Sequence, residues 1–170
     1  MTDVRRFLAE LFGSFILLAL GGFAVASTAT GVDGSIVVPL GFGLGLIVGL
    51  YYFGEISGGH YNPAVSLAAL LDRRIGPKTF VIYLVAQVVG FALAGYAILA
   101  ATTKEITVLT MTLPNEAAGV SSLDVVLIEM LATALLVGVI LRVTRSDTFG
   151  STAFLGIGLT ITALTLSFGG

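Results

Sequence analysis

One stretch of the sequence decides the fold, and it reads Ile56-Ser57-Gly58-Gly59-His60-Tyr61-Asn62-Pro63-Ala64-Val65-Ser66-Leu67-Ala68. Asn62 is a residue type that caps helix N-termini well, and Pro63 suits the first helical position because its missing N–H would have no intrahelical partner. The pattern therefore predicts a helix over residues 62–71, which ends before a charged run that starts at Asp72. Such a helix is roughly 15 Å long at 1.5 Å per residue, about half the thickness of a bilayer core.

Long apolar segments flank this half-helix on both sides. Hydrophobic residues make up 56% of the chain and charged residues 11%, with a mean hydropathy of +1.06, whereas about a quarter of the residues of a soluble protein are charged. The composition predicts an all-α integral membrane protein. The unpaired N–H groups at the start of the half-helix then lie at membrane depth, where irregular backbone is tolerated only if it lines a cavity. These features predict a pore.

The composition also argues against several classes of function. The formal net charge is -2 and the eight Lys and Arg residues are scattered, so no basic stripe indicates nucleic-acid binding. The chain has no Cys and one His, which gives no cluster for a metal ion. We expect no cofactor. The sequence contains no phosphate loop and no pairing of a nucleophile with a base, so we do not expect an enzyme.

Five segments are long and apolar enough to be predicted as membrane-spanning helices, namely residues 7–27, 36–54, 79–101, 123–141 and 151–168. The second segment is rich in glycines, which allow helix backbones to approach closely: Gly41, Gly43, Gly45 and Gly49. We expect this helix to pack tightly at one face.

The distribution of Lys and Arg predicts the orientation of the spans. If residues 55–71 enter and leave the membrane on the same side, that side holds all but one of these residues: Arg5, Arg6, Arg73, Arg74, Lys78, Arg142 and Arg145. Lys104 alone lies on the other side. The distribution thus favours a re-entrant half-helix and predicts a multi-pass protein of the cell membrane with a cytoplasmic N-terminus.

The sequence also contains two internal correspondences. Ala9-Glu10-Leu11-Phe12-Gly13-Ser14 corresponds to Ile128-Glu129-Met130-Leu131-Ala132-Thr133, and Leu40-Gly41-Phe42-Gly43-Leu44 recurs 115 positions later as Leu155-Gly156-Ile157-Gly158-Leu159. Because an odd number of spans separates the two copies, the second is inverted, as is typical of channels and transporters. The predicted organisation is a first repeat over residues 1–101, an extracellular connection over 102–122, and an incomplete second repeat over 123–170.

The same offset places the counterpart of the half-helix loop at residues 170–179, beyond the sequence. We therefore expect five spanning helices and one re-entrant half-helix here, with the second half-helix and the sixth helix missing. A closed pore lined by two half-helices is not expected from these residues alone.

The stretch from Ile56 to Ala68 resembles the first signature loop of the aquaporin, or major intrinsic protein, family. Ala9-Glu10, Ala86-Gln87 and the region around Glu129 resemble that family too, so the resemblance covers essentially the whole chain. It implies six spanning helices and two half-helices that meet at the midplane, in a homotetramer with one pore per subunit. The family's second Asn-Pro-Ala loop and the arginine of its selectivity constriction have no counterpart in this sequence.

The Asn-Pro-Ala motif, here Asn62, Pro63 and Ala64, is expected to exclude protons. The Asn62 side-chain oxygen can cap the half-helix while its NH2 group donates into the lumen, and the positive helix end opposes cations. By resemblance, the residues before it present backbone carbonyls to the permeating molecule: Gly58, Gly59, His60 and Tyr61.

Two glutamates lie inside apolar helices, where ionisable groups face the interior and have partners. The resemblance implies that Glu10 anchors the loop of the first repeat and Glu129 that of the second, with Gln87 in the same buried support. A proton relay through Glu10 and Glu129 is the alternative.

Selectivity is predicted from two positions. Phe42 lies where water-selective members of the family carry Phe and glycerol facilitators more often carry Trp, and Thr165 lies where many water-selective members have His. Both residues also have a structural explanation, since Phe on a buried helix face usually belongs to the core and Thr in a membrane helix often bonds its own backbone. The favoured function is a passive water channel in the lipid bilayer. A facilitator for glycerol or another small neutral solute, and a truncated nonconducting membrane protein, are the alternatives.

Overall fold

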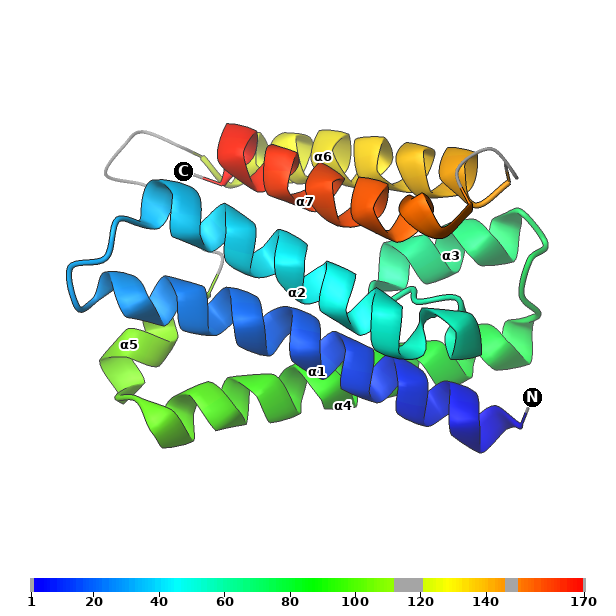
Figure 1. The fold of residues 1–170 in the computed structure, drawn as a ribbon, viewed down its shortest axis with the longest axis horizontal. Coiled ribbons are helices and arrows are strands. Elements are labelled where there is room, and N and C mark those ends of the chain that lie inside the picture. The colour runs from blue at the N-terminus through cyan, green and yellow to red at the C-terminus, as the bar shows by residue number, and fades with distance from the viewer. Residues whose placement is uncertain (1, 112–120, 146–149, 170) are drawn as a thin grey trace.

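The computed structural model describes residues 2–111, 121–145 and 150–169, and these residues form a bundle of helices (Figure 1). The helices are α1 (Asp3–Thr28), α2 (Gly34–Ser57), α3 (Pro63–Leu71), α4 (Pro77–Ala101), α5 (Lys104–Leu109), α6 (Ser122–Val143), the 3-10 helix η2 (Gly150–Thr152) and α7 (Ala153–Phe168). The predicted all-α membrane fold with one half-helix is confirmed.

Four helices, α1, α2, α4 and α6, are long and apolar enough to cross a membrane. The fifth predicted span is shorter, because only the 16 residues of α7 are α-helical. These residues extend about 24 Å at 1.5 Å per residue. The η2 turn adds about 6 Å at about 2 Å per residue, so the two together match the roughly 30 Å of a bilayer core.

The glycines of α2 contact two neighbouring helices. Gly41 and Gly45 lie against α1, where a Cβ atom on Gly41 would be 2.4 Å from the Ala24 Cβ. Gly43 lies on another side of the helix, against α7. The predicted tightly packed face is therefore found against α1, and Gly43 packs on a second side of the helix, because glycines four residues apart share a face whereas the intervening Gly43 does not.

The half-helix α3 lies entirely in the half of the bundle that holds the N-terminus (Figure 1). Its nine residues are followed by a turn at Asp72 and Arg73, after which α4 begins at Pro77. The chain thus leaves by the end through which it entered, as predicted for a re-entrant segment.

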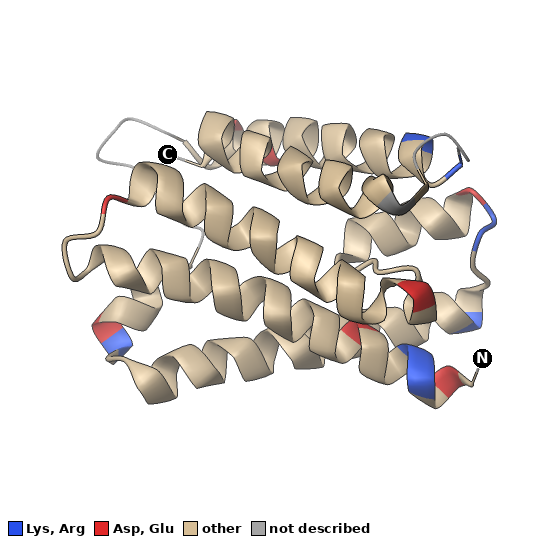
Figure 2. Ribbon diagram, viewed as in Figure 1, with Lys and Arg blue, Asp and Glu red and all other residues tan. Residues whose placement is uncertain are grey.

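The ends of the bundle differ in charge. Lys and Arg gather at the end formed by the start of α1, the turn after α3 and the end of α6, whereas the opposite end carries one such residue, Lys104, on α5 (Figure 2). Ion pairs tie segments together at the basic end: Lys78 Nζ lies 2.7 Å from Asp3 Oδ2, and Arg145 contacts Asp72. The basic end of the bundle is thus the end that the distribution of Lys and Arg predicted to be cytoplasmic.

Two predicted loops differ in detail. The connection predicted over residues 102–122 contains α5, a helix whose N-cap Thr103 accepts a hydrogen bond from the Ile106 N–H. Residues 112–120 of that connection, and residues 146–149 of the second charged loop, lie outside the described residues.

Candidate functional site

The half-helix begins where the sequence predicts. Asn62 is the N-cap residue in extended conformation, and its Oδ1 accepts a hydrogen bond of 2.7 Å from the Ala64 N–H. Pro63 occupies the first turn, where no N–H partner is needed. Because the cap uses the side-chain oxygen, the Asn62 NH2 group is left to donate elsewhere.

The residues before Asn62 form an irregular loop whose backbone turns repeatedly. Gly58 and Gly59 have φ values of 94° and 65°, and Tyr61 has a φ of 44°, in the left-handed region that non-glycine residues rarely adopt. A Cβ atom on Gly59 would lie 2.3 Å from Leu50 Cδ2, so a larger residue does not fit there. The surrounding helices therefore hold this loop in a strained conformation.

The Tyr61 side chain fixes the loop to α1 and α2. It is completely buried, and its ring lies over Gly13 so closely that a Cβ atom on that glycine would be 2.0 Å from Cε1. Its hydroxyl donates to the Gly49 carbonyl at 3.0 Å. The Tyr61 side chain thus belongs to the core.

Glu10 accepts hydrogen bonds from the loop inside the bundle. Its carboxylate, with the residue 0% exposed, accepts from the His60 N–H at 3.0 Å and the Tyr61 N–H at 2.9 Å. It also accepts from the Ser57 hydroxyl at 2.6 Å and from Gln87 Nε2 at 2.7 Å. All four partners donate, so both carboxylate oxygens act as acceptors. Orphan N–H groups of the loop are satisfied in this way.

Further polar side chains extend this group of hydrogen bonds. Gln87 Nε2 also donates to Ser66 Oγ at 2.9 Å, and Ser66 Oγ lies 3.1 Å from His60 Nδ1. The Tyr83 hydroxyl donates to the Ser57 carbonyl, and the Tyr83 ring meets the His60 ring edge-on with centroids 5.0 Å apart. Helices α1, α3 and α4 are thus joined through one buried network.

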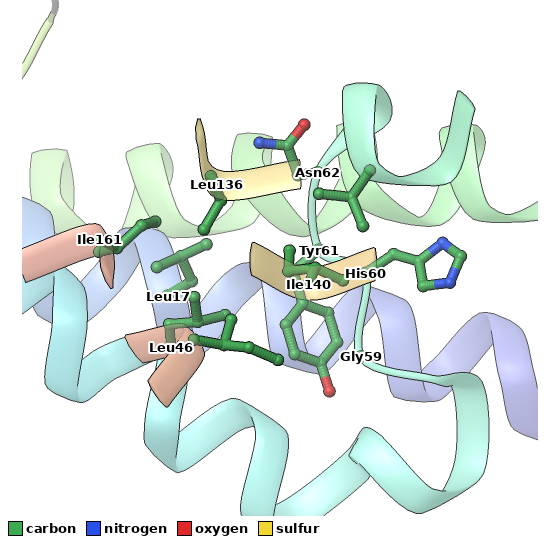
Figure 3. Close-up of a pocket in the computed structure, with 11 residues that line it drawn as sticks. Leu17, Leu46, Gly59, His60, Tyr61, Asn62, Leu136, Ile140 and Ile161 are labelled. Atoms are coloured by element: carbon green, nitrogen blue, oxygen red, sulfur yellow. The ribbon is translucent and has the colours of Figure 1, made fainter. Parts of the chain in front are cut away.

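Two neighbouring cavities lie beside the loop. The smaller one, of about 20 Å³, has the loop backbone and Asn62 on one side and apolar side chains on the other, among them Leu17, Leu136 and Ile161 (Figure 3). A volume of this size accommodates about one water molecule. An apolar wall opposite a few polar groups is the usual composition of a small-molecule site.

The larger cavity, of about 240 Å³, lies towards the basic end and is lined in part by Ser57, Gly58, Arg74 and Thr144. Its lining shares three residues with that of the smaller cavity: His60, Val65 and Ile140. The two spaces are therefore adjacent along the loop, with these residues between them.

Three predicted site residues lie away from this group. Phe42 packs its ring on Gly21 of α1, where a Cβ atom would be 2.3 Å from the ring. Thr165 is half-buried on α7, and neither residue lines the two cavities. Glu129 is exposed on α6, the least buried of the four long spans.

Sequence reasoning missed three members of the buried network, Ser57, Ser66 and Tyr83. Helical spacing contained a signal for two of them. Ser66 lies four residues after the N-cap Asn62, and Tyr83 four residues before Gln87, so helical spacing places each of them close to a residue that was predicted for the site.

Apolar spanning helices around a capped half-helix, with cavities along its loop, define a membrane channel protein. The family described as major intrinsic protein matches residues 1–170. This chain belongs to that family, which is a family of channels.

Individual relatives agree with this assignment. The glycerol uptake facilitator protein-like 6 of Lactiplantibacillus plantarum is 36% identical over 163 residues, which cover 94% of this chain and 72% of that protein. Human aquaporin-1 (Homo sapiens) is also 36% identical over 163 residues, with coverage of 93% and 60%. The X-ray structure of the aquaglyceroporin from Plasmodium falciparum superposes with a TM-score of 0.82 at 26% identity, over 99% of this chain and 72% of that one.

Proposed function

We propose that this chain supplies the first Asn-Pro-Ala half of a passive water channel of the aquaporin type. The observation that carries the proposal is the position of Asn62, which caps the half-helix through Oδ1 and lines a cavity with room for about one water molecule. Its NH2 group and the positive helix end favour the oxygen of a passing water and oppose a cation or hydronium.

The roles of the neighbouring residues are part of the same proposal. The carbonyls of Gly58, Gly59, His60 and Tyr61 offer acceptors that replace lost hydration. Gly59, His60 and Tyr61 line the smaller cavity and Gly58 the larger one, which supports this role. Phe42 and Thr165 are proposed for the selectivity constriction on the strength of the resemblance alone.

Anchoring is proposed for Glu10 and Gln87, supported by the hydrogen bonds from the loop to the carboxylate. Glu129 is proposed as the corresponding anchor for a second loop. The division into a first repeat over 1–101, a connection over 102–122 and a second repeat over 123–170 belongs to the same proposal.

The setting of the channel is also proposed. We infer a homotetramer in the cell membrane with a cytoplasmic N-terminus, supported by the family and by the basic end of the bundle (Figure 2). The chain spans 72% and 60% of the length of the two relatives described above. Conduction is accordingly proposed for the complete reading frame that contains these residues.

A facilitator for glycerol is the second candidate. The names of the bacterial relative and of the aligned solved structure favour it, because one is a glycerol uptake facilitator-like protein and the other an aquaglyceroporin. The cavity beside Asn62, with room for about one water molecule, supports the first candidate.

Osmotic swelling of proteoliposomes distinguishes these candidates. Vesicles with the complete reading frame, vesicles with the 170-residue chain and empty vesicles are compared by stopped-flow light scattering in water and in glycerol gradients. We expect the complete protein to carry water well above the empty vesicles and glycerol poorly. Glycerol flux comparable to water flux would overturn the preference for water, and no flux of either solute would favour a nonconducting protein.

A further inference from the structure

We propose that Ser66 and Gln87 are positioning residues that hold the His60 ring in one neutral tautomer, with the proton on Nε2 and Nδ1 as an acceptor. An N–H donor then faces the larger cavity. The inference follows from the directions of successive hydrogen bonds, and it rests on the proposed function only in assigning that donor to a permeating molecule.

The chain of hydrogen bonds starts at Glu10. Its carboxylate can only accept, so the Gln87 amide must turn its NH2 group, and not its oxygen, towards Glu10 Oε2 at 2.7 Å. The opposite orientation would place two oxygens against each other in a fully buried site, since Glu10 and Gln87 are both 0% exposed. The orientation of the Gln87 amide is therefore fixed.

The second hydrogen of the same NH2 group points to Ser66 Oγ at 2.9 Å. Ser66 accepts this bond and has one proton of its own to donate. Among the described residues, the partner of that hydroxyl is His60 Nδ1 at 3.1 Å. Because Ser66 is 0% exposed, its proton needs an acceptor inside the protein, and Nδ1 provides one only if it carries no hydrogen.

A protonated Nδ1 would leave a further group of the network without a partner, besides the buried Gln87 Oε1, which has none among the described residues. It would donate to Ser66 Oγ, which already accepts from Gln87, and the buried Ser66 proton would then have no acceptor. This holds for the other neutral tautomer and for the doubly protonated ring. The groups that face His60 agree: the guanidinium of Arg74 lines the same larger cavity and disfavours a second positive charge. Tyr83 meets the ring edge-on, and Glu10 is engaged with the His60 backbone N–H.

The remaining nitrogen, Nε2, lies on the open side of the ring. Figure 3 shows the ring turned away from Leu136 and Ile161, and His60 lines the larger cavity. Gly58 lies beside Nε2, and a Cβ atom there would approach it to 3.3 Å, so a glycine at this position leaves the N–H uncovered. An N–H at Nε2 donates to the oxygen of a water or alcohol, which gives the loop a second donor besides Asn62.

The experiment uses the fact that His60 is the only histidine in the sequence. Protein labelled with 15N-histidine shows one imidazole, whose two nitrogen shifts report directly which nitrogen carries the proton. We expect a single species near neutral pH with protonated Nε2 and unprotonated Nδ1. If the wild-type protein showed a protonated Nδ1 or an averaged mixture of tautomers, the proposal would be overturned without any variant.

Two variants then test the role of Ser66. Ser66→Ala removes the donor to Nδ1, and we expect its spectrum to show a mixture of tautomers or a shift to the other one. Ser66→Thr keeps the hydroxyl and is expected to restore the wild-type spectrum. An unchanged tautomer in Ser66→Ala would show that Ser66 does not position the ring. The NMR measurement does not depend on conduction. If the protein conducted nothing but still held one tautomer, the proposed function would be contradicted and this inference would stand.

Discussion

Gly43 and Gly158 face each other where α2 crosses α7. A Cβ atom on Gly43 would be 2.7 Å from the carbonyl oxygen of Gly158, and a Cβ atom on Gly158 would be 2.7 Å from that of Gly43. The side-chain contacts are reciprocal as well, since Gly43 meets Thr162 and Gly158 meets Ile47. Both pairs of residues, 43 with 158 and 47 with 162, are separated by the repeat offset, so the crossing has the contacts that a two-fold axis requires.

We predict that Gly158→Ala destabilises this crossing. The added methyl group would meet the backbone of Gly43, which cannot move without separating the helices. Such overpacking costs about 1–3 kcal/mol, which outweighs the roughly 0.5–1 kcal/mol that Ala gains over Gly in a helix. Thermal unfolding in detergent should show a lower midpoint.

Gly156→Ala is the matched control for that experiment. It lies in the same motif on α7, and nothing lies within 4 Å of a Cβ atom there. We expect an equal or higher midpoint for this variant. If both substitutions lowered the midpoint equally, the close approach of Gly43 and Gly158 would not be the cause.

We further predict that Glu10→Gln loosens the re-entrant loop. A Gln side chain offers one accepting oxygen and turns an NH2 group towards donors that the carboxylate now satisfies, two of which are the N–H groups of His60 and Tyr61. Leaving buried donors unpaired costs about 1–3 kcal/mol for each group. Hydrogen exchange should therefore become faster at the amides of these two residues.

Glu55→Gln controls for the loss of a charge, because Glu55 is exposed near the end of α2. Exchange at the His60 and Tyr61 amides is expected to stay at the wild-type rate in this variant. Slow exchange in Glu10→Gln as well would mean that other contacts, such as the packing of the Tyr61 ring on Gly13, suffice to hold the loop.

The sequence predicted the half-helix accurately because its signals are local. The cap and the proline that begin α3 are adjacent residues, and the structure begins the helix where they predict. Hydropathy likewise located the long spans. The glycines of α2 were harder to interpret, since spacing reveals which of them share a face but not which helix will cover that face.

The network around His60 depends on contacts between distant parts of the chain. Glu10 lies 50 positions before His60, and Gln87 lies 21 positions after Ser66. Burial of Glu10 and Gln87 could be expected from polar groups in apolar helices. The direction of each hydrogen bond, and so the tautomer of the ring, required the three-dimensional arrangement.

A pH-dependent contribution is predicted at the basic end. A hydrogen bond from Arg74, with Arg145 adding to it, holds the pKa of the Asp72 carboxyl below its ordinary value. Because the folded-state pKa is lower than the unfolded value of about 3.9, these contacts stabilise the fold above about pH 4. The contribution is lost as the pH falls through the folded-state pKa.

Thermal midpoints of the wild type and of Asp72→Asn test this dependence. We expect the wild type to be the more stable near neutral pH and the difference to vanish in acid. High salt should also shrink the difference, because these side chains are at least partly exposed to solvent. A difference that is constant from pH 6 to pH 3 would assign the effect to packing.

Two substitutions at Asn62 separate its two roles, capping and donation. Asn62→Asp keeps a capping oxygen, and Asp and Asn are equivalent caps, so the stability of α3 should change by less than about 0.5 kcal/mol. The substitution replaces the NH2 donor with a full negative charge, which exceeds the roughly half charge at the helix N-terminus. We expect proton or cation leakage through the complete protein, measured with a pH-sensitive dye in proteoliposomes under an imposed potential.

Asn62→Ala is expected to lower the stability of α3 without adding a negative charge. Loss of the hydrogen bond to the Ala64 N–H should cost about 1 kcal/mol of stability, while the positive helix end remains and continues to oppose cations. Leakage should therefore be small in Asn62→Ala and large in Asn62→Asp. Equal leakage in the two variants would show that the amide, and not the sign of the local charge, is what excludes protons.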